Sequence, residues 1–139
     1  MITVVDTSIL LDLFLEDPKF AEASAEALQA ADAAGSLMIC DIVYAELCSR
    51  FPSRELLDDA LAKLDVRVEP FDRDIDFQAG RAFRTYREKG GPRNRILSDF
   101  MIGAHAQTKA AQLLTRDRGF YGAYFRKLKI LDPTARAKA

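Results

Sequence analysis

The chain has 139 residues, of which 49% are hydrophobic and 29% are charged, and its formal net charge is −1. A chain of this size and composition is typical of one globular domain that buries roughly 68–70% of its unfolded surface. We therefore expect a single domain over residues 1–139, with a frayed tail after about residue 133. Because the net charge is close to zero, overall charge gives no evidence for nucleic-acid binding. Evidence for such binding would have to come from local basic patches.

Targeting segments and cysteine usage give the expected compartment. Residues 1–6 lack the basic region and the long apolar stretch of a signal peptide. No segment approaches the ~20 apolar residues needed to cross a bilayer, so we expect a cytoplasmic protein. Two cysteines, Cys40 and Cys48, are too few for a disulfide framework and have no partners at zinc-ligand spacing. Both are expected to be buried thiols in a reducing compartment.

The first half of the chain alternates short apolar runs with helical segments. The β-branched run at residues 2–5 predicts a buried strand, and residues 8–15 predict a short helix that Pro18 ends. The following elements are expected to be a helix over 19–34 ending at Gly35, a strand over 37–39, a helix over 42–50 capped by Asp41, a helix over 54–64 capped by Ser53, and a strand over 66–68.

The second half continues the same alternation. Its expected elements are a long helix over 72–89 ended by a Gly-Gly-Pro sequence, a basic loop over 92–97, a helix over 99–109 capped by Ser98, a strand over 112–114, a turn or short helix from 119, and a strand over 129–131. Strands that alternate with helices indicate an α/β fold, with a central, mainly parallel sheet flanked by helices.

Two aspartates follow strands of this expected sheet. Asp6 comes directly after the first strand, and Asp117 follows the strand at 112–114 by a few residues. In open α/β sheets, ligands bind at the carboxyl ends of the strands. We therefore expect two separate strand-to-helix connections to bring these carboxylates to the same edge of the sheet.

Two further acids lie on expected helices. Asp99 is in the first turn of its helix, and Glu46 lies beside the apolar stripe that contains Val43 and Leu47. Because of this position, we do not expect the Glu46 carboxylate to be freely solvated. Each acid also has an ordinary interpretation: Asp6 as a helix cap, Asp99 as a first-turn acid favoured by the helix dipole, Asp117 as a cap of the turn at Gly119, and Glu46 as an ion-pair partner of Arg50.

A shared pocket of carboxylates would need a compensating charge. Two like charges ~4 Å apart repel by about 4 kcal/mol at an effective dielectric of 20. A divalent cation removes this cost, and carboxylate oxygens suit Mg²⁺ or Mn²⁺. Such an ion can activate water for attack on a phosphodiester. The single histidine, His105, lies in an apolar run and is expected to be structural, and the chain has no glycine-rich nucleotide-binding loop.

Four segments carry a further signal: VVDTSILLDLF, YAELCSR, ILSDFMIGAHA and LLTRDRGFY. Together they resemble the PIN-domain family, most closely the VapC-type toxins of bacterial toxin–antitoxin pairs, and they follow one another in the family's order over nearly the whole chain. The resemblance implies a three-layer α/β/α fold and Mg²⁺- or Mn²⁺-dependent endoribonuclease activity. It also implies a small VapB-type antitoxin as partner, an RNA substrate and a homodimer.

The resemblance also implies roles for individual residues. The catalytic, metal-binding acids would be Asp6, Glu46, Asp99 and Asp117. Thr7, Ser8 and Thr115 would support them, with Ser8 standing where the family more commonly has asparagine.

A local basic run leads towards Asp99 and offers a path for a nucleic-acid backbone. We expect Arg87, Arg93 and Arg95 to contact phosphates together with Arg116, which precedes Asp117. A solvated helix face with ion pairs is the alternative interpretation of this basic run.

Other functions remain open from the sequence. A DNA nuclease on the same scaffold would use the same acids. A phosphatase is disfavoured because Ser8 stands where a second aspartate would be expected. A catalytically silent binding module is disfavoured because all four acids are present.

Overall fold

The computed structural model describes residues 1–93 and 95–134. Its core is a five-stranded sheet in which every pair of neighbouring strands is parallel, in the order β3-β2-β1-β4-β5. The strands are β1 (Ile2–Val5), β2 (Ser36–Ile39), β3 (Val66–Val68), β4 (Gln112–Leu114) and β5 (Lys129–Leu131). The helices are α1 (Thr7–Phe14), α2 (Ala21–Ala34), α3 (Asp41–Cys48), α4 (Arg54–Lys63), α5 (Arg73–Glu88), α6 (Leu97–Lys109) and α7 (Arg118–Tyr124).

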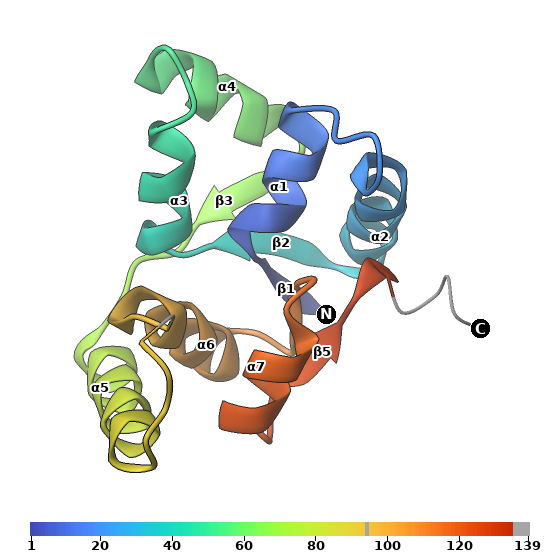
Figure 1. Cartoon of the computed structure of the whole chain (residues 1–139). Helices are drawn as coiled ribbons and strands as arrows, with labels where there is room; N and C mark the ends of the chain where they lie inside the picture. Colours follow the sequence, from blue (N-terminus) through green and yellow to red (C-terminus); the bar gives the residue numbers. More distant parts are fainter. Residues whose placement is uncertain (94, 135–139) are drawn as a thin grey trace.

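The strand order places the helices in two layers. The chain moves from β1 through β2 to β3 in one direction across the sheet, and then from β4 to β5 in the other. Because crossover connections between parallel strands are right-handed, α1 to α4 cover one face and α5 to α7 the other, as Figure 1 shows. The expected α/β fold with a central sheet flanked by helices is confirmed. The direction reverses between the neighbouring strands β1 and β4, and such a switch point is where open α/β sheets bind ligands.

The central strands are apolar because helices cover them from both sides. Val4 and Val5 of β1, Ile39 of β2 and Leu113 and Leu114 of β4 are fully buried. Continuous apolar runs of this kind, rather than alternating ones, are typical of strands in parallel sheets. The core therefore holds the carboxyl ends of β1 and β4 in fixed register, with Val5 opposite Leu114.

Two expected helix caps are wrong. Cys40, not Asp41, occupies the N-cap position of α3, and Asp41 is the first residue of that helix. Helix α6 begins at Leu97, before Ser98, and the Asp99 carboxylate accepts a hydrogen bond from the backbone N–H of Ile96 at 3.0 Å. An acid at the third helical position thus replaces the expected serine cap. The cap on α4 is confirmed, because Ser53 Oγ accepts from the Leu56 N–H at 3.2 Å.

The two cysteines differ in exposure. Cys40 is buried, as expected, but Cys48 is exposed at the end of α3, so the expectation of two buried thiols is wrong for Cys48. None of the helices among the described residues is long and apolar enough to cross a membrane. At the C-terminal end, the Asp132 carboxylate accepts a hydrogen bond from the Thr134 N–H at 2.8 Å. Most of the expected frayed tail, residues 135–139, lies outside the described residues.

Candidate active site

Asp6 lies at the switch point of the sheet, between the end of β1 and the start of α1. Its backbone N–H donates to the carbonyl of Leu114 at 2.9 Å, which joins it to the end of β4. Its Oδ1 accepts from the Thr7 N–H at 2.8 Å, and its Oδ2 accepts from Thr115 Oγ1 at 2.7 Å. Asp6 therefore caps α1, as the ordinary interpretation proposed, and also faces the residues that follow β4.

Thr115 connects Asp6 to Asp117. This threonine is fully buried, and its hydroxyl oxygen accepts from the Asp117 N–H at 3.0 Å while donating to Asp6. One hydroxyl group therefore fixes both a carboxylate and the backbone of the second acid. The supporting role that the family resemblance implies for Thr115 stays a prediction, and these two hydrogen bonds are the contacts on which it would rest.

Glu46 reaches the same edge from α3. Its Oε1 accepts from Thr7 Oγ1 at 2.7 Å, across 39 positions of the chain. The residue as a whole is exposed, so it lies at the rim of the site and not in the interior. No ion pair joins Glu46 to Arg50 within the described part of the chain. Ser8 is half-buried and makes no side-chain hydrogen bond to these acids among residues 1–93 and 95–134, so of the two only Thr7 contacts Glu46 directly.

The electrostatic environment of Asp6 indicates a concentration of negative charge. The pKa of the Asp6 carboxyl is raised from its ordinary value of 3.8 to about 6, mainly because the group is buried. The charges of Glu46 and Asp117 add to this rise, and hydrogen bonds from Thr115 and Thr7 oppose it. Only 9% of Asp6 is exposed. A cation bound beside Asp6 would remove this penalty, because it would stabilise the charged form.

Tyr121 is a member of this site that the sequence did not reveal. It is buried on α7, and burial raises the pKa of its phenol, with further contributions from the charges of Asp6, Asp99 and Asp117. The phenol therefore stays protonated, and the charges that act on it include three of the four acids. The available signal was its spacing, because Tyr121 lies one helical turn after Asp117 in α7.

Arg95 forms an ion pair with the carboxylate of Asp117. Its Nη1 and Nη2 donate to Asp117 Oδ2 and Oδ1 at 2.5 and 3.2 Å, and its guanidinium lies 4.3 Å from the centre of the Phe120 ring. Asp117 is at the N-cap position of α7 but makes no side-chain capping bond, so the capping interpretation is wrong for this residue. Arg95, expected to contact a phosphate, is instead paired with one of the acids.

Arg116 also has a different partner from the one expected. Its Nε and Nη2 donate to Asp12 Oδ2 and Oδ1 at 2.9 and 3.0 Å, and its guanidinium lies 3.9 Å from the centre of the Phe20 ring. The Asp12 side chain is 4% exposed and also accepts from Ser24 Oγ at 2.7 Å. Arg116 therefore ties the segment before Asp117 to α1 and α2, and its contact with a phosphate stays a prediction.

His105 lies outside the site. Its ring is buried on α6, its Nε2 is 2.9 Å from the backbone oxygen of Glu69, and it packs edge-to-face on Phe71. Burial lowers the pKa of the imidazole, which favours its neutral form. These contacts agree with the structural role expected for this residue.

The donor set suits a hard divalent cation, but the side chains as they stand do not form a complete metal site. Carboxylate oxygens are the ligands that Mg²⁺ and Mn²⁺ prefer, and the raised pKa of Asp6 indicates uncompensated charge. Among residues 1–93 and 95–134, however, no three His, Cys, Asp or Glu side chains are grouped closely enough to hold a metal ion. Asp117 in particular would have to exchange Arg95 for the metal.

The pKa of Asp6 predicts a measurable dependence of stability on pH. Because this pKa is higher in the folded protein, folding favours the protonated carboxyl, and ionisation of Asp6 lowers the free energy of unfolding as the pH rises. Between pH 4 and 7 in EDTA, we expect the wild type to lose about 2 kcal/mol relative to Asp6→Asn. Urea unfolding of both proteins at the two pH values measures this difference, and identical pH dependence in the two would contradict it.

The fold and the site define a class of protein, an α/β protein with an acidic site at the switch point of a parallel sheet. The family model for the PIN domain matches residues 3–126, so the chain belongs to the PIN-domain family. Members of this family are nucleases. No match was found among curated proteins.

Solved structures share the fold at low sequence identity. The VapBC2 complex from Rickettsia felis bound to a promoter DNA fragment contains a chain with 22% identity and a TM-score of 0.73, over 95% of this chain and 98% of that one. A chain of VapBC-1 from nontypeable Haemophilus influenzae has 23% identity and a TM-score of 0.70, over 96% of this chain and 99% of that one. The Mycobacterium tuberculosis toxin VapC20, described as cleaving the sarcin-ricin loop, has 22% identity and a TM-score of 0.62, over 91% of this chain and 98% of that one.

Proposed function

We propose that the protein is a Mg²⁺- or Mn²⁺-dependent endoribonuclease and the toxin of a toxin–antitoxin pair. The observation that carries this proposal is the linkage of three acids at the switch point through two threonines. Thr7 binds Glu46, and Thr115 joins Asp6 to Asp117. Membership of the PIN-domain family and the fold shared with a toxin described as cleaving the sarcin-ricin loop support an RNA substrate.

The proposed mechanism assigns the metal to the four acids. Asp6, Glu46, Asp99 and Asp117 would hold the ion, which would supply a Lewis acid for activating water and for stabilising negative charge on the phosphodiester. Thr115 orients the Asp6 carboxylate and the Asp117 backbone, and Thr7 orients Glu46. The protonated phenol of Tyr121 supplies a neutral hydrogen-bonding group beside the acids, so it adds no further negative charge where the phosphate binds.

The proposed partners follow the matched complexes. Several chains of the same fold come from VapBC complexes, so we propose a small VapB-type antitoxin as partner, and a homodimer as the toxin assembly. A short gene for a DNA-binding antitoxin next to the gene for this chain would support the pairing.

Incubation of the purified protein with total RNA tests the proposed activity. We expect internal cleavage at defined sites with Mg²⁺ or Mn²⁺ and no cleavage with EDTA, with mapped ends that recur between preparations. Single- and double-stranded DNA of matched length are the parallel substrates. Cleavage of DNA alone would favour the DNA-nuclease alternative, and no cleavage of any substrate with either metal would favour a silent binding module.

A further inference from the structure

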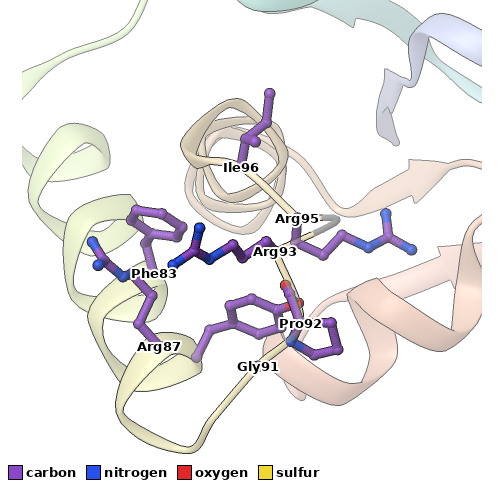
Figure 2. A pocket seen from close by; sticks show the side chains of 8 residues that line it. Phe83, Arg87, Gly91, Pro92, Arg93, Arg95 and Ile96 are labelled. Carbon is purple, nitrogen blue, oxygen red and sulfur yellow. The ribbon is translucent and has the colours of Figure 1, made fainter.

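A cavity of about 420 Å³ lies between α5 and the loop that leads into α6. We call it the arginine pocket. The lining residues proposed to contact the ligand are Phe83, Arg87, Arg93 and Ile96. Figure 2 shows the Arg93 side chain extending towards Phe83 and Arg87, whereas Arg95 extends the opposite way. The pocket is separate from the four acids, but the loop that forms one wall of it continues into the helix that carries Asp99.

The arginine pocket carries positive charge that the protein does not neutralise. Within the described part of the chain, neither Arg87 nor Arg93 is paired with a carboxylate. Neighbouring arginines differ: Arg84 on the same helix pairs with Glu88 at 3.1 Å, and Arg95 pairs with Asp117. Two free guanidinium groups at one cavity indicate an anionic ligand.

The pocket also offers apolar surface. The Phe83 ring is half-buried and lies 5.7 Å from the Arg87 guanidinium. At the other side, Ile96 is 60% exposed, although large apolar residues usually avoid water. The occupant therefore needs a flat or apolar part as well as negative charge. A nucleotide has both, because every base has a face that stacks on aromatic side chains and every phosphate binds arginine.

The loop wall of the pocket is held in place before any ligand binds. The Gly91 N–H donates to the backbone oxygen of Tyr86 at 2.9 Å, and the Tyr86 hydroxyl donates to the carbonyl of Pro92. A Cβ atom on Gly91 would lie 2.5 Å from the Tyr86 ring, so glycine allows the loop to pack directly on it. A preformed wall lowers the cost of ordering on binding.

The pocket adjoins the candidate active site through Arg95. This residue lines the pocket wall while its guanidinium binds Asp117. Four positions after Arg95, Asp99 accepts from the Ile96 N–H at the start of α6. Arg95 therefore joins the wall of the pocket directly to one of the four acids.

We propose that the arginine pocket binds one nucleotide of single-stranded RNA next to the cleaved bond. Its base lies against Phe83 and Ile96, and its phosphate is bound by Arg87 and Arg93. This inference rests on the proposed ribonuclease function and adds to it a specific binding site for the substrate.

RNA binding without cleavage tests the pocket. The protein carries Asp6→Asn throughout, and fluorescence anisotropy with a labelled 12-nucleotide RNA is measured in EDTA at several salt concentrations. We expect Arg87→Gln with Arg93→Gln to weaken binding by about tenfold or more and to lower the salt slope by about 0.7, the contribution of one single-strand phosphate. The charge-matched control is Arg54→Gln with Arg67→Gln, both exposed and on α4 and β3. Equal affinity and slope in the two double variants would overturn the proposal.

A second variant tests the base-binding part. Phe83→Leu keeps apolar volume against Phe100 but removes the aromatic face. We expect a loss of affinity of about 5- to 150-fold for the RNA, and little change for a polyglutamate peptide of equal charge. Equal losses for both ligands would show an unspecific anion site and overturn the nucleotide assignment. Because these assays need no cleavage, their failure leaves the metal-dependent activity measured on total RNA as a separate result.

Discussion

Asp6→Asn is expected to reduce metal-dependent RNA cleavage by about 10²–10³-fold or more. Asparagine preserves the size of the side chain and one oxygen acceptor, but it removes the charge that a cation would bind at the switch point. Asp6 is the acid whose two oxygens are already oriented, by Thr7 and Thr115. Initial rates with Mn²⁺ on one mapped RNA site measure the effect.

The control for this prediction is a change of the same kind away from the site. Asp59→Asn alters an exposed acid on α4 that pairs with Lys63 at 3.1 Å, and we expect wild-type rates from it. Circular dichroism and the urea midpoint check that Asp6→Asn remains folded. Wild-type cleavage by a folded Asp6→Asn protein would show that the site assignment is wrong.

The largest effect on stability is expected from Asp12→Ala. This change leaves the Arg116 guanidinium, held over Phe20 at the junction of α1, α2 and the segment after β4, without its carboxylate partner. Removing one partner of a buried ion pair typically costs about 3–5 kcal/mol, because the other charge remains buried. Urea unfolding gives the free energy of unfolding directly.

An exposed ion pair supplies the comparison for Asp12. In the Lys63–Asp59 pair the side chains are 76% and 63% exposed, so Asp59→Ala should cost less than about 1 kcal/mol. A second comparison is the double change Asp12→Ala with Arg116→Met, which removes both charges and should recover much of the lost stability. If Asp12→Ala were no more destabilising than Asp59→Ala, the pair would not hold the segment before Asp117 in place.

The fold could be predicted from the sequence because its signals are local. The β-branched run before Asp6, the apolar run before Thr115 and the glycines and prolines between segments mark strands and helix ends within a few residues. The acids Asp6 and Asp117 could be placed together because the carboxyl ends of parallel strands share one edge. The elements and the shared position of these two acids therefore follow from the spacing of residues along the chain alone.

The pairings of charged side chains could not be predicted in the same way. Arg116 binds Asp12 across 104 positions, and Arg95 binds Asp117 across 22. Which arginine meets which acid depends on where helices cross, and nothing in the local sequence distinguishes these arginines from Arg93. Tyr121 was missed for a related reason, since an aromatic residue on an apolar helix face has the pattern of an ordinary core residue.

The strand order has a consequence for how copies of this chain can associate. The outermost strands, β3 and β5, are only three residues long, and each carries an exposed basic side chain, Arg67 and Lys129. Short edges with charged side chains discourage another strand from extending the sheet. Sheet-to-sheet aggregation is therefore disfavoured at both margins, and a dimer would have to join through helical surfaces, with the two sheets remaining discontinuous.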